Sequence, residues 1–305
     1  MGNPYDGIIL IDKAEGKTSF DVVKAVRRLL KVKKVGHAGT LDPFATGLLI
    51  ILLGQGTKLS NYLMAGDKAY QATMRLGVET DTQDLTGRVV KMSLVPEFEP
   101  ESISKVALGF VGEIEQVPPL FSAVNYRGKR AYQLAREGIK MDLQKRRVKV
   151  HSLAITSVHL PDVTMKVTCS RGTYVRSLAA DLGKELGPGA HLKSLRRLCS
   201  GPFSVEDALS LENLEHLSQD RSVQQIRIPL REALPDMKEA KVDGAMAQRI
   251  RNGYQPGCGE VAMAELPRFF DGYMKLIEGE VLVAIAKVQH LLENKASLKI
   301  MRVFN

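Results

Sequence analysis

An unbroken apolar run over Leu48–Leu53 predicts a buried strand, although periodicity alone would also fit a buried helical turn. A second apolar strand is expected over residues 7–13. Apolar and polar positions alternate over 69–78, which predicts a half-buried strand with Tyr70 on its apolar side. The same alternation predicts two further strands, at 146–158 and 163–170.

Helical spacing is clearest in the segment that follows Thr18 and Ser19, either of which is expected to cap the helix. Its apolar positions share one face: Val22, Val26, Leu29 and Leu30. Its other side and C-terminal end are basic, which favours a phosphate contact over a merely solvated face: Lys24, Arg27, Arg28, Lys31, Lys33 and Lys34. Further helices are expected at 103–110, within 126–136, and up to about residue 186.

The pattern changes after a proline-containing junction at 229–235. Before it, mixed helices and strands predict one large domain over residues 1–235. Beyond it, short apolar runs separated by glycines predict a small β-rich domain over residues 236–305.

The charge balance indicates which kind of partner the protein binds. The 305-residue chain has 43 Lys and Arg against 34 Asp and Glu, a net charge of +9, which favours a polyanionic partner such as nucleic acid. No apolar run approaches the roughly 20 residues needed to cross a bilayer, and no signal-peptide pattern follows the N-terminus. The three cysteines are far apart, which argues against disulfides, a Cys-based zinc site and a zinc-dependent base deaminase. We therefore expect a cytoplasmic protein without a metal.

The candidate chemistry lies just before the first apolar run, in the sequence VGHAGTLDPFATGLL over residues 35–49. This segment contains three glycines, His37 and the pair Asp42–Pro43. Pro43 disfavours the helical region for the residue before it, so the Asp42 carboxylate is expected on an extended or turning backbone. An isolated Asp-Pro pair is typical of a turn, and only its surroundings favour a catalytic role.

The sequence GHAGTLDPFATGLL strongly resembles the catalytic motif of the TruB family of tRNA pseudouridine synthases. The resemblance covers residues 7 to about 205, and the C-terminal stretch is more loosely similar to a PUA domain. The other matching motifs are Lys68-Ala69-Tyr70 with Arg75-Leu76-Gly77, Gln116-Val117-Pro118-Pro119, Gly172-Thr173-Tyr174-Val175-Arg176 and Leu195-Arg196-Arg197-Leu198. Two positions depart from the family pattern, because Ala14 stands where proline is usual and Asn125 where lysine is common.

The resemblance implies an α+β pseudouridine synthase fold, with a mixed, mostly antiparallel sheet, flanking helices and a central cleft. It also implies an RNA-gripping insertion at about 124–147 and a small PUA-like domain over 236–305. The implied reaction isomerises uridine to pseudouridine at position 55, in the T loop of tRNA. It needs no cofactor and no metal. The implied partner is the tRNA T arm, bound by a monomer.

The resemblance also implies roles for individual residues. Asp42 is the candidate nucleophile, and an Asp with a pKa near ~3.9 is ionised at neutral pH without a general base. The resemblance implies that Arg176 lies beside Asp42, where its charge would oppose the rise in the pKa of Asp42 that burial causes. Tyr70 would stack on the flipped uracil, Leu195 would form an apolar wall, and His37 would enter the RNA loop. The expected phosphate-contacting and other substrate-binding cations are Lys13, Lys58, Lys129, Arg130, Lys145, Arg146 and Arg147.

Two other functions fit parts of the sequence. An RNA-binding protein without catalysis would not need the set Asp42, Tyr70 and Arg176. An enzyme of the same fold that uses a guide RNA is disfavoured by the insertion at 124–147 and by the lack of long basic tails. The order of bond changes stays open between attack on the base, attack on the sugar, and a glycal route. If Asp42 were not the acid, Asp81 and Asp84 would be the next candidates.

Overall fold

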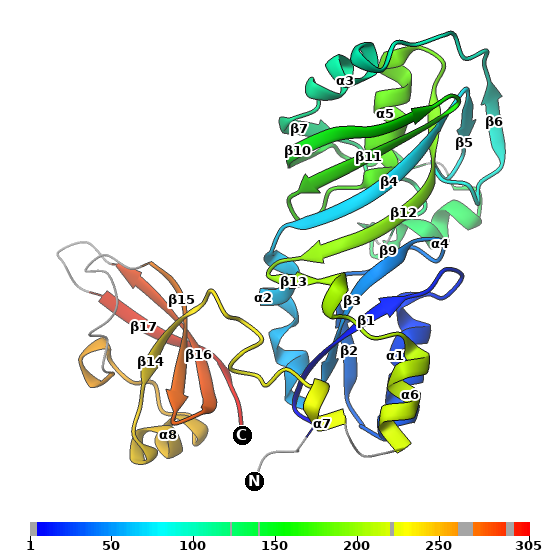
Figure 1. Ribbon diagram of the computed structural model, residues 1–305. Coiled ribbons are helices and arrows are strands. Elements are labelled where there is room, and N and C mark those ends of the chain that lie inside the picture. Colours follow the sequence, from blue (N-terminus) through cyan, green and yellow to red (C-terminus); the bar gives the residue numbers. More distant parts are fainter. Residues whose placement is uncertain (1–4, 123, 140, 220–222, 262–270, 291–295) are drawn as a thin grey trace.

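The computed structural model describes residues 5–305 apart from 123, 140, 220–222, 262–270 and 291–295. The larger part of the molecule is built around a nine-stranded sheet, and the smaller C-terminal part around a four-stranded sheet. Figure 1 shows the smaller part beside the lower half of the larger one. Among the described helices, none combines the length and the apolar character that a membrane span requires.

The large sheet confirms the expected α+β class with a mixed, mostly antiparallel sheet. Its order is β1 (Gly7–Lys13), β3 (Thr46–Leu53), β12 (Ala190–Ser200), β4 (Lys68–Leu76), β11 (Asp162–Cys169), β10 (Arg146–His159) and β7 (Gly112–Gln116), with β2 (Val35–Ala38) on β3 and β13 (Phe203–Ser204) on β12. The described pairings are antiparallel except that of β12 with β3. This parallel pairing rests on Arg196 opposite Thr46 and Arg197 opposite Gly47. Strand β12 therefore joins the two halves of the sheet.

Helices flank both halves of this sheet (Figure 1). The upper half carries α3 (Pro100–Leu108) and α5 (Val175–Leu186), and the lower half carries α1 (Ser19–Leu30), α2 (Ser60–Ala65) and α6 (Leu211–Gln219). The residue that caps α1 is Thr18, whose hydroxyl accepts from the backbone N–H of Asp21. The Asp21 carboxylate in turn accepts from the backbone N–H of Thr18. This reciprocal pair satisfies two amides at the start of the helix.

Both faces of β3 are buried, which explains its unbroken apolar sequence and decides in favour of a strand. One face, with Leu49, Ile51 and Leu53, packs in a core shared with α1. The other face, with Leu48, Ile50 and Leu52, packs in a second core that continues into the C-terminal part. Burial of one such side chain contributes roughly 1.5–3 kcal/mol. The strand that follows the candidate carboxylate is therefore anchored on two sides.

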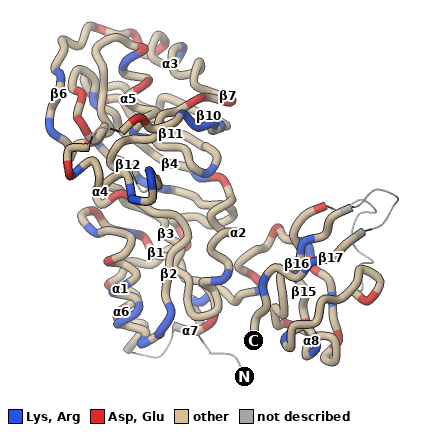
Figure 2. The backbone as a smooth tube through the Cα atoms, turned by 180° about the vertical axis from the view of Figure 1, so that it is seen from behind, with Lys and Arg blue, Asp and Glu red and all other residues tan. Residues whose placement is uncertain are grey.

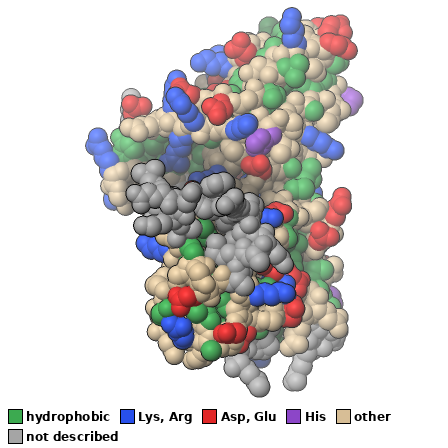
Figure 3. All heavy atoms as spheres, turned by 90° about the vertical axis from the view of Figure 1, so that its left-hand side faces the viewer, with side chains coloured by type: hydrophobic (Ala, Val, Ile, Leu, Met, Phe, Trp, Pro, Cys, Tyr) green, Lys and Arg blue, Asp and Glu red, His purple; other side chains and the backbone are tan. Residues whose placement is uncertain are grey.

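The C-terminal sheet has the order β14 (Lys238–Lys241), β15 (Gly272–Glu278), β16 (Val281–His290) and β17 (Ala296–Val303), with α8 (Gly244–Arg251) packed on β16. Phe304 is buried in the core that contains the second face of β3. The ammonium of Lys58 donates to the backbone carbonyl of Val303 at 2.6 Å, and the backbone N–H of Asn305 donates to Gln55 at 2.9 Å. The two parts thus share a core and hydrogen bonds. Figure 3, which views the molecule from this side, shows Lys and Arg side chains spread over the larger part above the C-terminal one.

The insertion expected at 124–147 contains a hairpin and a short helix. Strand β8 (Asn125–Tyr126) pairs with β9 (Lys129–Arg130), and α4 (Ala131–Arg136) follows. The helix expected within 126–136 is therefore limited to its second half, because Gly128 has φ +85° and turns the hairpin. Figure 2 shows blue Lys and Arg positions gathered close to α4.

The strand expected over 69–78 is shorter than predicted. It ends at Leu76, because Gly77 has φ +81° and breaks the extended backbone. Val78 instead begins β5 (Val78–Thr80), which pairs with β6 (Val89–Met92) in a separate hairpin.

Candidate active site

The carboxylate of Asp42 lies on the loop between β2 and β3, and neighbours on both sides fix this loop. The hydroxyl of Ser19 accepts from the backbone N–H of Leu41 at 2.9 Å and donates to its carbonyl at 3.2 Å. The ammonium of Lys13 donates to the carbonyl of Pro43 at 3.1 Å. The loop is therefore held immediately before and immediately after Asp42.

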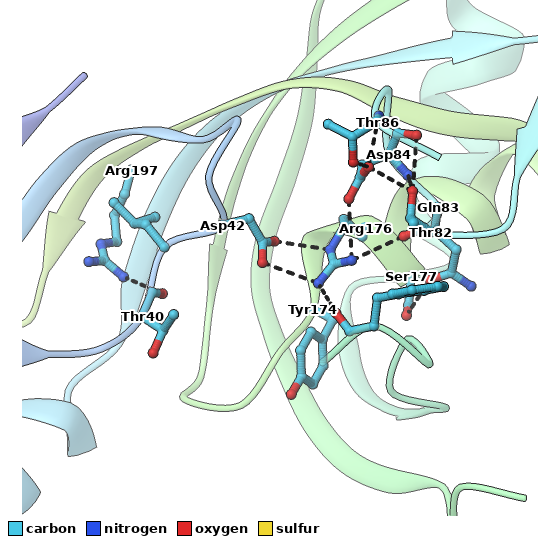
Figure 4. Close-up of polar contacts among 12 residues, drawn as sticks. Thr40, Asp42, Thr82, Gln83, Asp84, Thr86, Tyr174, Arg176, Ser177 and Arg197 are labelled. Carbon is cyan, nitrogen blue, oxygen red and sulfur yellow. Dashed lines mark hydrogen bonds and ion pairs between the residues drawn. The ribbon is translucent and has the colours of Figure 1, made fainter. Parts of the chain in front are cut away.

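Arg176, at the start of α5, faces this carboxylate (Figure 4). Its Nε lies 3.0 Å from Oδ2 of Asp42, and its Nη2 donates to Oδ1 at 3.2 Å. The Arg176 side chain is only 4% exposed, whereas that of Asp42 is 33% exposed. The ion pair therefore has a buried cation and a carboxylate that remains accessible from the cavity.

Further contacts fix the guanidinium of Arg176 in its plane. Its Nη1 donates to the carbonyl of Thr82 at 3.0 Å and to Oδ2 of Asp84 at 3.3 Å, and its Nη2 also donates to the carbonyl of Phe121 at 3.0 Å. Asp84 is itself held by the hydroxyls of Thr82 and Thr86 at 2.7 and 2.6 Å. Figure 4 shows this network on the side of Arg176 opposite Asp42. The arginine is thus oriented before any substrate binds.

Burial raises the pKa of Asp42 above its ordinary value of 3.8. The positive charges of Arg176 and Lys13 oppose this rise, and the negative charge of Asp84 adds to it. Arg176 therefore acts in the direction expected from the sequence, but it does not cancel the effect of burial. Concave walls surround the carboxylate, so burial dominates even though one third of the side chain is exposed.

A cavity of about 580 Å³ opens above Asp42. Five of the predicted site residues line it: Asp42, Tyr70, Leu195, Arg147 and Arg176. Arg146, another predicted phosphate contact, lies in the same wall. Burial raises the pKa of Tyr70, and the charge of Arg197 opposes this rise. The volume of the cavity lies within the range of ordinary ligand sites.

The other predicted residues lie outside this wall. Lys13 is fully buried and its ammonium donates to three carbonyls, so the structure places it under the loop rather than against a substrate. Lys58 lies at the contact with the C-terminal part, because it binds the carbonyl of Val303. His37 is half-buried on β2, and burial lowers its pKa. Lys129 and Arg130 are exposed on β9 in the insertion.

Arg197 is a site residue that the sequence did not assign. It is 1% exposed, and its Nε donates to the carbonyl of Leu48 at 2.7 Å. Its Nη2 donates to the carbonyl of Gly39 at 3.1 Å, and its Nη1 lies 3.5 Å from that of Thr40. It therefore fastens both ends of the loop that carries Asp42. The alternation of β12 could have shown that one of the two adjacent arginines points inward, but not which one.

Gln116 had no role assigned from the sequence, and Asp84 was named there only as an alternative acid. The side chain of Gln116 accepts from the backbone N–H of Tyr174 at 2.8 Å and donates to its carbonyl at 3.0 Å, which pins the start of α5. Asp84 could have been found from the threonine-rich turn that contains it, since hydroxyls are common partners of a buried carboxylate. Among the described residues, no three His, Cys, Asp or Glu side chains are grouped as a metal ion would require.

Residues 27–175 match the family described as TruB family pseudouridylate synthase (N terminal domain), and residues 176–240 match the tRNA pseudouridylate synthase B C-terminal domain. The chain is 42% identical over 306 residues to tRNA pseudouridine synthase B of Geotalea uraniireducens (strain Rf4), covering 98% of each protein. It is also 42% identical over 303 residues to the protein of the same name from Geobacter sulfurreducens, covering 98% of this chain and 100% of the relative.

Two solved structures share the fold over 99% of this chain. A chain of a Cbf5-Nop10-Gar1 complex is 26% identical with a TM-score of 0.76, and 85% of that chain is covered. A chain of an H/ACA RNP bound to a substrate RNA containing 2′-deoxyuridine is 24% identical with a TM-score of 0.74, and 86% of it is covered. The expected α+β pseudouridine synthase fold is thereby confirmed, whereas the PUA-like character of the C-terminal part stays a prediction.

Proposed function

The chain belongs to the TruB family of pseudouridylate synthases, and from this premise we propose that it isomerises uridine to pseudouridine at position 55, in the T loop of tRNA. It is an enzyme of the isomerase class. The observation that carries the proposal is the ion pair of Asp42 and Arg176 at the bottom of a cavity lined by Tyr70 and Leu195. A binding protein has no need of an accessible carboxylate aimed at polyanionic RNA.

The proposed reaction breaks the bond between N1 of uracil and the ribose, turns the base, and joins C5 to the same ribose carbon. No atom is added and no electron is transferred, so the chain's own residues can supply the chemistry. Asp42 is the nucleophile in this proposal, because it is accessible from the cavity and three further partners fix its neighbour Arg176. The fixed arginine stabilises the ionised form of Asp42 and holds both its oxygens in place.

The cavity suits a base that has left its stack. Extruding a nucleotide from folded RNA costs a few kcal/mol, and a stacking face can recover roughly 1–3 kcal/mol of this. Tyr70 offers that face, and Leu195 offers an apolar wall. We propose that His37, on β2 next to the catalytic loop, occupies the place that the extruded base leaves.

Basic residues are proposed to position the RNA backbone without reading its bases. Arg147 lies in the wall of the cavity, and Lys129 and Arg130 lie on the exposed hairpin of the insertion. The C-terminal part is proposed to be PUA-like and to contact tRNA beyond the T loop. The whole chain is proposed to act as a monomer. Relatives named as tRNA pseudouridine synthases support a cytoplasmic location for the same activity.

The test is release of tritium from C5-labelled uridine in a T-arm stem-loop RNA. Joining C5 to the sugar expels its hydrogen, so we expect stoichiometric release by the wild-type chain. A stem-loop with cytidine at position 55 and labelled uridines elsewhere is the matched control and should release no label. Binding of the stem-loop without release would favour the RNA-binding alternative. Release only when a guide RNA is added would favour the guide-dependent one.

The rate should depend on pH through Asp42. Burial raises its pKa above 3.8, so the reactive carboxylate is present above the raised pKa and is lost as the pH falls through it. We therefore expect single-turnover tritium release, measured from about pH 3 to about pH 8, to decline on the acid side before the ordinary Asp pKa is reached. Circular dichroism over the same range separates this decline from unfolding. A decline centred at or below 3.8 would contradict the assignment.

A further inference from the structure

A second cavity of about 580 Å³ lies between the two parts of the molecule. Its walls come from α2, from the turn between β12 and β13, from the linker at 233–237, and from β15 and β17. Figure 1 shows α2 facing β15 across this region. The cavity has the volume of a small-molecule site and lies at a domain interface, where such sites are frequent.

The walls combine aromatic rings with cations. Tyr62 and Tyr273 pack edge to face, with ring centroids 5.2 Å apart and an interplanar angle of 82°. Tyr273 remains 42% exposed, so part of its ring is available for stacking. Two arginines, Arg171 and Arg302, and one carboxylate, Asp236, lie in the same walls. The cations therefore outnumber the anion.

A buried hydroxyl adds an independent observation. Ser200 is 1% exposed and belongs to the lining of this cavity. Within the described part of the chain, its Oγ has no hydrogen-bond partner. A buried polar group without a partner costs about 1–3 kcal/mol, so a rotation of the Ser200 side chain that turns its Oγ toward a ligand in the cavity would be favourable.

The two arginines of this cavity are also available to bind a ligand. Arg302 donates to the carbonyl of its neighbour Met301 at 2.7 Å, and no carboxylate within the described residues forms an ion pair with it or with Arg171. Guanidinium groups without a carboxylate partner are suited to phosphate. Aromatic faces beside such groups are the usual combination for single-stranded nucleotides.

We propose that this cavity binds one unpaired nucleotide, with its base on Tyr273, its phosphate on Arg302 and a hydrogen bond to Ser200. The base must be unpaired, because a base stacked within a duplex offers no free face to the ring of Tyr273. Arg171 lines both this cavity and the one above Asp42, so the two sites are neighbours along one surface. That the nucleotide belongs to the tRNA rests on the function proposed above. The binding of a nucleotide in this cavity does not depend on that function.

The test uses the full chain and two variants of the cavity, Tyr273→Leu and Arg302→Gln. Lys299→Gln is the charge-matched control, because Lys299 is exposed on the same strand and does not line the cavity. Binding of the three nucleoside 5′-monophosphates other than UMP is measured by saturation-transfer NMR, because UMP would also enter the uridine-binding cavity proposed above Asp42. We expect transfer to at least one of them with the wild type and the control, and loss of transfer with both cavity variants.

Affinity for full-length tRNA identifies the source of the nucleotide. If it is part of the tRNA, both cavity variants should weaken tRNA binding by roughly tenfold, while Lys299→Gln stays near the wild type. Lost monophosphate binding with unchanged tRNA affinity would support the site and assign it to a free nucleotide. Absence of transfer with the wild type, or equal transfer with all variants, would overturn the proposal. Failure of the wild type to release tritium would overturn the proposed function and leave the monophosphate measurement valid.

Discussion

Asp42→Asn is expected to lower single-turnover tritium release on the order of 10⁴-fold or more, which is the size of effect seen when a nucleophile is removed. The amide keeps the shape of the side chain but is not a nucleophile. It loses the charge that faces Nε and Nη2 of Arg176. Binding of the stem-loop should change by less than about threefold, because the variant removes a negative charge from a site for polyanionic RNA.

Asp81→Asn provides the matched carboxylate control for this experiment. Asp81 lies in the same turn as Asp84 and pairs with Arg88 on the surface at 3.2 Å. Among the described residues, Asp81 forms no hydrogen bond or ion pair with Asp42 or Arg176, so its variant should keep nearly full activity. An active Asp42→Asn variant would remove Asp42 from the mechanism, and attention would pass to Asp84.

Arg197→Met is expected to lower kcat by about 100-fold with little change in KM, because a displacement of the catalytic group near 1 Å can have this effect. The methionine cannot bind the carbonyls of Leu48, Gly39 and Thr40, so the loop that carries Asp42 loses its fastening. Removing the cation should also raise the pKa of Tyr70 further, since Arg197 opposes its rise. The measurement is a kcat and KM determination on the stem-loop, with ultraviolet titration of Tyr70 against a Tyr70→Phe background.

Arg196→Met is the control for position and charge. Arg196 is the next residue on β12, but it points to Asp12, with Nη2 and Oδ2 2.6 Å apart, and its side chain is partly exposed. Its variant should keep kcat near that of the wild type. Arg197→Lys should recover part of the activity if the fastening matters. An unchanged pKa of Tyr70, or a loss in KM rather than kcat, would argue for a merely structural role.

Local pattern was sufficient for elements whose partners are close in the chain. Strand β3 and helix α1 were visible in the sequence because their apolar positions repeat with the period of the element. Asp42 was found through its motif, and Pro43 explained the backbone there. The matching motifs also pointed to Tyr70, Leu195 and Arg176. These residues line one cavity with Asp42, although 134 residues separate Asp42 from Arg176.

The partners of the cations could not be predicted from local sequence pattern. Lys13 and Lys58 have the charge expected of RNA contacts, but carbonyls distant in sequence bind them, at Pro43 and Val303. Those partners depend on how loops and the C-terminal strand pack, which has no local signature. For the same reason, the inward direction of Arg197 depends on the short parallel pairing of β12 with β3.

That pairing also has a consequence for protein synthesis. Arg197 lies 155 residues after Asp42, so at about 5–20 residues per second the loop is made roughly 8 to 30 s before the arginine that fastens it. During that interval the first three strands can pair, but the Asp42 loop has neither Arg176 nor Arg197 for most of it. A ribosome-bound chain that exposes nothing beyond residue 190 should therefore carry its carboxylate and remain inactive. Activity begins late in translation, when β12 closes the sheet.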